Sequence, residues 1–94
     1  MLKVTEAAQT ALKRIFDIRE LPPGRYLRLA IPPRWHEAGD FGIVIDQQEQ
    51  GDRAVAVDGI KVLLIDRELD RKLDKSVFDF KDTPQGEGFT LDVY

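Results

Sequence analysis

The sequence of 94 residues contains no cysteine. This absence excludes disulfides, thiolate zinc sites, thiol nucleophiles and iron–sulfur clusters held by thiolates of this chain. Histidine, tryptophan and serine occur once each, as His36, Trp35 and Ser76. The sequence also has no G-x-S-x-G nucleophile motif, no phosphate-binding loop and no H-E-x-x-H zinc motif. We therefore expect a protein that is not an enzyme, with no catalytic residues and no cofactor.

Long apolar runs and an excess of positive charge are lacking as well. No run approaches the ~20 apolar residues that span a bilayer, and the first ten residues lack the apolar centre of a signal peptide. The 14 lysines and arginines are interspersed with 17 acidic residues, and the net charge is −3. No basic stripe is therefore available to neutralise nucleic-acid phosphates. We expect a cytoplasmic protein with neither a membrane nor a nucleic acid as its partner.

The remaining composition is that of an ordinary globular chain, with 43% hydrophobic and 33% charged residues. Its length predicts a single domain over residues 1–94. From Thr5 to Arg19, apolar residues recur every three or four positions, which predicts an amphipathic helix with Thr5 as its N-cap. A second, short helix is expected from Asp66 to Leu73, with Asp66 as its N-cap.

Alternating or continuous apolar runs predict strands in the rest of the chain. Asp58-Gly59 between two such runs predicts a hairpin with a two-residue turn. The continuously apolar run Ile60 to Ile65 predicts a strand at the centre of a sheet. We expect an α+β fold with about six or seven strands in mostly antiparallel or mixed sheets, an N-terminal helix and a second short helix. The predicted strands are Arg25 to Ile31, Phe41 to Asp46, Ala54 to Val57, Ile60 to Ile65, Val77 to Phe80 and Phe89 to Val93.

Several short motifs follow one another in an order that resembles one known family. They are Thr5-Glu6-Ala7-Ala8, Leu27-Arg28-Leu29, Gly59-Ile60-Lys61-Val62, Asp66, Asp79-Phe80 and Glu87-Gly88-Phe89. This order and spacing resembles the HesB-like domain of the A-type iron–sulfur carriers, and the resemblance covers nearly the whole chain. It implies the HesB-like fold, in a cysteine-less and divergent member of a family involved in iron–sulfur cluster biosynthesis.

The cysteine ligands of that family are absent or replaced in this sequence. Family members carry one cysteine in the loop after Leu-Arg-Leu, where ungapped counting places His36 here. Two more lie in a C-x-C tail beyond the Asn-Glu-Gly-Phe strand, and this sequence ends at Tyr94, before such a tail would begin. We therefore expect a domain without cysteine ligation that binds another protein or a second copy of itself. Its link to iron–sulfur assembly is implied by the resemblance alone.

The loop from Arg34 to Asp40 contains the candidate site residues. Arg34 and Trp35 are the candidate interaction residues, because arginine and tryptophan are enriched among the residues that dominate interfaces. A second interpretation of Trp35 is that its ring covers one end of the core.

An alternative function is the binding of iron or another metal ion by His36, Glu37 and Asp40, since imidazole and carboxylates bind such ions. One chain supplies one histidine, so a second would come from a dimer. A solvated polar loop is the simpler interpretation of the same three residues.

A further group of acidic residues, Asp66, Glu68, Asp70 and Asp74, lies on and just after the second predicted helix. Asp66, Asp70 and Asp74 are spaced four residues apart and would share one helical face. They are interleaved with arginines and lysines. This pattern favours a solvated helix face over a metal or acid–base cluster.

Overall fold

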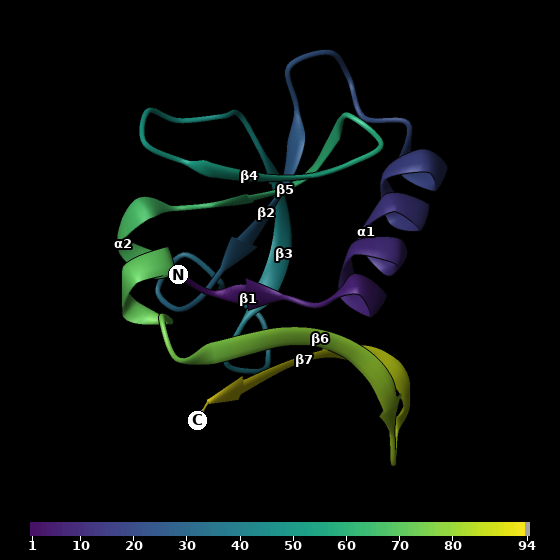
Figure 1. Ribbon diagram of the computed structural model, residues 1–94, viewed down its shortest axis with the longest axis vertical. Helices are drawn as coiled ribbons and strands as arrows, with labels where there is room; N and C mark the ends of the chain where they lie inside the picture. The colour runs from purple at the N-terminus through teal and green to yellow at the C-terminus, as the bar shows by residue number, and fades with distance from the viewer. Residues whose placement is uncertain (94) are drawn as a thin grey trace.

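Two β-sheets and two helices are formed by residues 1–93, the part of the chain that the computed structural model describes (Figure 1). Seven strands and two helices confirm the predicted α+β class. In chain order the elements are β1 (Lys3–Val4), α1 (Glu6–Arg19), β2 (Tyr26–Ala30), β3 (Gly42–Asp46), β4 (Arg53–Val57), β5 (Ile60–Ile65), α2 (Arg67–Lys72), β6 (Ser76–Thr83) and β7 (Gly86–Val93).

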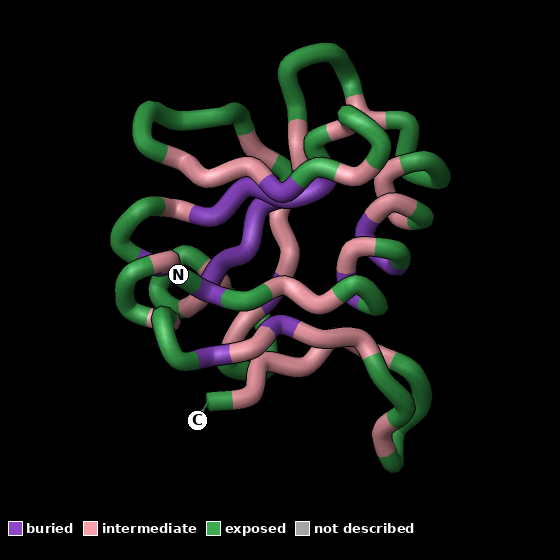
Figure 2. The backbone as a smooth tube through the Cα atoms, viewed as in Figure 1, coloured by how far each residue is buried: buried purple, intermediate pink, exposed green. Residues whose placement is uncertain are grey.

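The larger sheet has four strands in the order β3-β2-β5-β4, and the smaller has three in the order β1-β6-β7. Each sheet is mixed: β2 runs parallel to β5 and β1 parallel to β6, while the other neighbours are antiparallel. As predicted, β5 is an interior strand, and its residues Val62 to Ile65 are fully buried. Figure 2 shows that the buried backbone is concentrated where β2 and β5 run through the centre of the molecule.

Both helices begin at the predicted N-caps. The Thr5 hydroxyl oxygen accepts a hydrogen bond from the Ala8 amide at 3.1 Å. The Asp66 carboxylate accepts hydrogen bonds from the amides of Glu68 and Leu69. These bonds satisfy amide groups that have no partner within the first turn of a helix. Helix α1 buries Ala8, Ala11 and Leu12 against the core.

The last two strands are longer than the sequence predicts. β6 and β7 pair without interruption from Ser76 opposite Val93 to Thr83 opposite Gly86. The sequence predicts strands at 77–80 and 89–93, and in the structure residues 81–83 and 86–88 belong to the two strands as well. Continuous pairing extends the ladder to the tip, where Gly86 takes a φ of 110°. Next to the core, the Phe78 ring stacks on Phe89 at a centroid distance of 5.1 Å.

The two faces of β2 are buried in different ways. Leu27 is paired with Ile45 and Leu29 with Ile43, and both leucines belong to the hydrophobic core. Because side chains alternate along a strand, Arg28 must point to the opposite face. We call the face of Leu27 and Leu29 the inner face and the face of Arg28 the outer face. The Arg28 side chain is nevertheless 0% exposed.

Two further findings concern expectations from the sequence. Asp58 and Gly59 both have positive φ, 52° and 79°, as a type I′ hairpin turn requires, which confirms the predicted turn between β4 and β5.

No helix within residues 1–93 is long and apolar enough to cross a membrane.

The hairpin turn yields a first prediction. Gly59→Val should lower the free energy of unfolding by about 1 kcal/mol or more, because a β-branched residue is strained at positive φ. A Cβ at Gly59 would meet no atom within 4 Å, so the loss would reflect backbone strain and not a steric clash.

Gly88→Val is the matched control for this substitution. Gly88 also has open space around its Cβ position, but it is not among the glycines with positive φ. Urea denaturation of the two variants measures the difference. Equal stabilities would contradict the turn assignment.

Candidate functional site

A buried arginine organises the outer face of the larger sheet. Arg28 donates hydrogen bonds from Nη1 to Asp52 Oδ1 at 3.0 Å and from Nη2 to Asp52 Oδ2 at 2.5 Å. Nη2 also donates to the Gln47 carbonyl oxygen at 2.9 Å. Two parallel bonds between a guanidinium and a carboxylate form a strong and geometrically specific pair. The loop 47–52 is thereby folded over β2.

The partner carboxylate is as buried as the arginine. The Asp52 side chain is 1% exposed, and Oδ2 also accepts a hydrogen bond from the Glu49 amide at 2.7 Å. Burial opposes the ionisation of Asp52, but the hydrogen bonds from Arg28 and from the Glu49 amide outweigh it and hold its pKa below the ordinary value. The hydrogen bond to Asp52 likewise raises the pKa of Arg28. Both groups are therefore charged at neutral pH.

A second arginine connects the candidate loop to this pair. Arg34 Nη2 lies 3.2 Å from Asp46 Oδ2 and 3.3 Å from Glu49 Oε1. The same two carboxylates also face Arg28. Asp46 Oδ2 lies 3.2 Å from Arg28 Nε, and Glu49 Oε1 lies 3.5 Å from Arg28 Nη2. Shared carboxylates thus tie the loop 31–41 to the loop 47–52. Arg34 is 42% exposed, so part of this candidate interaction residue remains at the surface.

Trp35 packs against the first residue of β3. A Cβ placed on Gly42 would come within 2.3 Å of three indole atoms, so the ring lies directly on this glycine. The indole Nε1 donates to the Ala38 carbonyl oxygen at 3.1 Å, and the Trp35 amide donates to the Ile31 carbonyl oxygen at 3.0 Å. Trp35 is partly buried. It therefore covers β3 while leaving some of its surface accessible, and whether it binds a partner stays a prediction.

The residues of the metal-binding alternative lie at the surface. His36, Glu37 and Asp40 are all exposed. Among residues 1–93, the potential ligand groups that converge within 4.8 Å of one another are those of Glu49, Asp52 and Asp66, and this set includes none of the three. A single copy of the chain does not bring the predicted ligands into that set.

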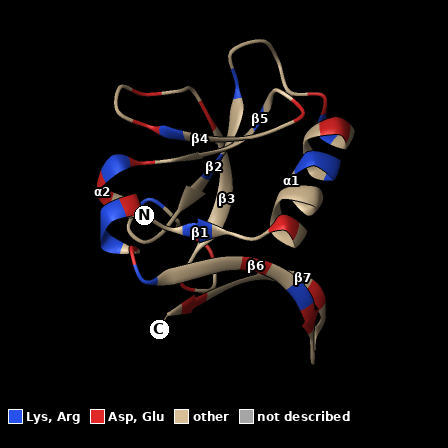
Figure 3. Cartoon of the chain, in the orientation of Figure 1, with Lys and Arg blue, Asp and Glu red and all other residues tan. Residues whose placement is uncertain are grey.

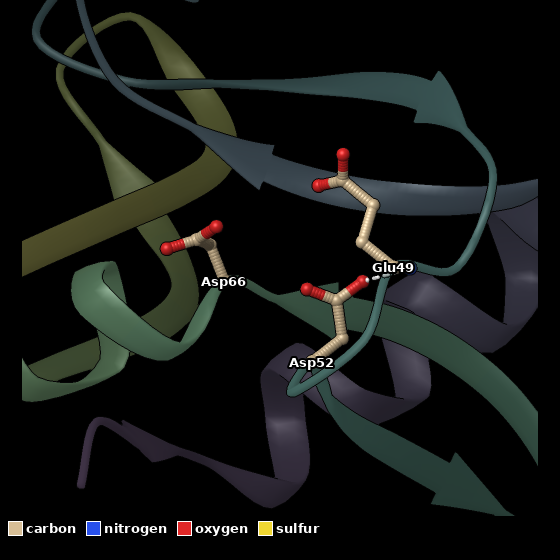
Figure 4. Close-up of side chains that lie close together, drawn as sticks. All are labelled: Glu49, Asp52 and Asp66. Atoms are coloured by element: carbon tan, nitrogen blue, oxygen red, sulfur yellow. Dashed lines mark hydrogen bonds between the residues drawn. The ribbon is translucent and has the colours of Figure 1, made fainter.

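The sequence did not predict that the carboxylates of Glu49, Asp52 and Asp66 lie together. Figure 4 shows Glu49 and Asp52 on the loop before β4 and Asp66 at the start of α2. Asp52 is held by Arg28, and Asp66 Oδ1 accepts amide hydrogen bonds as the N-cap. The guanidinium of Arg28 already provides positive charge to this cluster. A metal ion would have to compete with it.

The acidic face predicted at helix α2 is solvated only in part. Asp70 accepts hydrogen bonds from Arg53 Nε at 2.9 Å and Nη2 at 3.0 Å, and from the Leu2 amide at 2.8 Å. Asp74 pairs with the amino group of Met1. The prediction was wrong for Asp70, whose side chain is 15% exposed, because it holds the N-terminal segment beside α2. Asp74 is exposed. Figure 3 shows the mixed charges around this helix.

Comparison with known proteins gives a result at the level of structure. No family model matches the chain, and no curated protein matches it in sequence. Solved structures do match. SufA of Escherichia coli, involved in the biosynthesis of iron–sulfur clusters, is 22% identical with a TM-score of 0.63, over 98% of this chain and 84% of SufA. The chain has the fold of the A-type iron–sulfur carriers.

Two further structures agree with this likeness to the carriers. IscA, solved with a [2Fe-2S] cluster, is 21% identical with a TM-score of 0.58, over 99% of this chain and 82% of IscA. A protein from Aquifex aeolicus is 23% identical with a TM-score of 0.62, over 99% of this chain and 91% of its own. The predicted HesB-like, A-type carrier fold is confirmed. It is present here in a chain without cysteine.

The buried pair on this carrier fold yields a second prediction. Arg28→Met should lower the free energy of unfolding by about 3–5 kcal/mol at pH 7, because Asp52 would remain buried without its cation. The deficit should shrink as the pH falls below about 4. The depressed pKa of Asp52 stabilises the native protein above the unfolded-state pKa, and this contribution is lost as the pH falls through the folded-state pKa.

Urea denaturation between pH 7 and pH 3 measures both effects. Lys13→Met is the control, because Lys13 forms an ordinary surface pair with Asp17 on α1. Its removal should cost less than about 1 kcal/mol. A loss from Arg28→Met as small as that of the control would show that the buried pair does not hold the outer face.

Proposed function

We propose that the chain is a non-enzymatic protein-interaction module on the carrier fold, without cluster ligation, that acts with other proteins of iron–sulfur cluster assembly in the cytoplasm. The observation that carries the proposal is the pairing of this fold, over nearly the whole chain, with the absence of every cysteine. Imidazole and hard carboxylates are poor substitutes for thiolates at iron–sulfur centres. What remains is a scaffold with surfaces that can contact proteins.

The loop from Arg34 to Asp40 is the proposed contact surface. In the carriers, this is the region of the first ligand cysteine, by the resemblance of the Leu27-Arg28-Leu29 motif. Here the loop is held at one end by the ion pairs of Arg34 and at the other by Phe41, whose ring packs edge-on against Phe78 at 5.8 Å. A loop that is already ordered loses less conformational entropy on binding. Trp35 and Arg34 add the residue types that dominate interface energetics.

The partner that we propose is a protein, with a second copy of the chain as the other candidate. Nucleic acid and membrane are disfavoured by the interspersed charges of the sequence and its net charge of −3. The metal-binding alternative at His36, Glu37 and Asp40 is tested alongside the leading proposal, because metal analysis separates the two.

The loss of ligation yields a third prediction. Protein purified without chelators should be colourless, and anaerobic reconstitution with iron and sulfide should yield no stable cluster after gel filtration. Visible absorption and metal analysis of the protein fraction measure this. Stoichiometric bound chromophore would contradict the loss of cluster ligation. Iron or zinc without chromophore, lost on His36→Ala, would favour the metal-binding alternative.

The loop yields a fourth prediction. Trp35→Ala should weaken association with the partner by about thirtyfold, corresponding to ~2 kcal/mol, while the fold is retained. Gly42→Ala should have a similar effect, because its Cβ would displace the indole without removing it. In that variant, fluorescence quenching should report a more accessible Trp35, since this is the single tryptophan.

The partner is first captured from the native cytosol, and its association with each variant is then measured by titration. Self-association is measured by sedimentation. Ile18→Ala is the control, because Ile18 is a 74% exposed apolar residue on α1, outside the loop. A sharp loss of thermal stability in Trp35→Ala, with normal association of the folded fraction, would show that the indole serves only to cover β3.

A further inference from the structure

The edge strand β3 leaves one side of its backbone unpaired. It is an outer strand of the larger sheet, and β2 is its one neighbour among the strands of residues 1–93. Within that range, no backbone group of residues 42–46 bonds to a turn, loop or side chain. An edge of this kind presents free N–H and C=O groups to an incoming strand. The five residues Gly42–Asp46 therefore form a template for strand addition.

The opposite edge of the same sheet is protected and β3 is not. β4 carries a register shift between Val55 and Ala56, and it begins with the charged residue Arg53. Bulges, lysines and prolines are the usual means of blocking an edge. β3 pairs with β2 without a register shift and consists of glycine, three β-branched residues and a terminal aspartate. Its sequence favours pairing with a further strand.

An apolar groove lies on the inner face beside this edge. It has a volume of about 370 Å³ and is lined by Ile15 and Arg19 of α1, Leu27 of β2, Ile43 and Ile45 of β3, and Phe89 of β7. Helix α1 contacts β4 and β5, and it contributes Ile15 and Arg19 to the lining of the groove beside β2 and β3. Figure 1 shows the helix on one side of the four-stranded sheet. Ile45 is 47% exposed there. Side chains from one face of an added strand would enter this groove.

Arg19 supplies an unbalanced charge at the groove. Its side chain forms no hydrogen bond or ion pair within residues 1–93, as is also true of Arg14, Arg25, Arg67 and Arg71, but among these arginines Arg19 alone lines the groove. A partner that brings a carboxylate to the inner face would be complementary to this cation.

A second copy of the chain would not provide that carboxylate through its own β3. If two copies paired along β3 about a two-fold axis perpendicular to the sheet, as in a closed dimer, their inner faces would lie on the same side. The aspartate of β3, Asp46, is paired with Arg28 and Arg34 on the outer face. The copy's Asp46 would therefore lie on the side of the sheet away from Arg19. The charge pattern favours a different protein over self-association.

We propose that β3 and the adjoining groove form a docking site for an extended peptide segment of alternating apolar residues that carries a carboxylate. The segment would add to the sheet beside β3 by main-chain hydrogen bonds, place alternate apolar side chains in the groove, and pair its carboxylate with Arg19. This docking site adjoins the Arg34 to Asp40 loop, whose Trp35 and Arg34 contact Gly42 and Asp46 of β3. It does not depend on a link to iron–sulfur assembly.

Nitrogen-15 NMR titration with a synthetic probe tests the proposal. The probe is the peptide acetyl-Thr-Val-Thr-Ile-Thr-Val with a free terminal carboxylate, compared with the same peptide as its amide. The free acid should shift the amide signals of residues 42–46 and of the groove residues. The amide form should bind about fivefold more weakly, because it lacks the charge that pairs with Arg19.

Two pairs of variants locate the interaction. Arg19→Gln should remove the difference between acid and amide, whereas Arg14→Gln, on the same helix but not lining the groove, should preserve it. Ile45→Lys should abolish binding, whereas Ile18→Lys should not, since Ile18 is 74% exposed and lies outside the groove. A thermal melt of each variant confirms that it is folded.

Three outcomes would overturn the proposal. The first is the absence of shifts in residues 42–46 at millimolar peptide. The second is binding that is equally strong for acid and amide or that is indifferent to Ile45→Lys. The third is a change in the amide signals of residues 42–46 when the protein concentration is raised in the absence of peptide. That result would show that a second copy of the chain occupies the edge.

Discussion

The paired charges of Arg28 and Asp52 are the interaction on which the arrangement of the outer face depends. A guanidinium with no exposed surface in the middle of a strand requires a carboxylate and a carbonyl oxygen above it, and the loop 47–52 supplies both. That loop then presents Glu49, which with Asp46 holds Arg34 of the next loop. Such a pair adds little net stability compared with apolar packing, but it is costly to break, and so it selects one arrangement of the loops.

The likeness to SufA and IscA concerns the scaffold and leaves the chemistry open. The sheets, helices and their order are those of the carriers, over nearly the whole chain. The chain contains no cysteine and therefore has no thiolate with which to hold a cluster. The loop after β2 has Trp35 packed on Gly42 and Arg34 bound to carboxylates. The fold alone does not establish the function, which must be argued from these side chains.

Two surfaces of the molecule could contact a protein, and they differ in their physics. The Arg34 to Asp40 loop offers a partly exposed indole and a guanidinium that is already paired. Recognition there would depend on shape and on the aromatic ring. The β3 edge offers free backbone groups beside an apolar groove with one unpaired cation at Arg19. Recognition there would depend on main-chain hydrogen bonds, with side chains setting specificity.

The sequence by itself determined the elements whose signals are local. It predicted the Thr5 and Asp66 caps, the Asp58-Gly59 turn and the central position of β5, and the order of its motifs predicted the carrier fold. Only the tertiary structure decided that Arg28 is buried, that Glu49, Asp52 and Asp66 converge, and that Asp70 binds Arg53. An arginine between two leucines is the pattern of a strand with one solvated face, and nothing local shows that a loop will cover it. Caps and turns are formed by residues within a few positions of one another, whereas these contacts join distant segments whose approach depends on strand register and loop path.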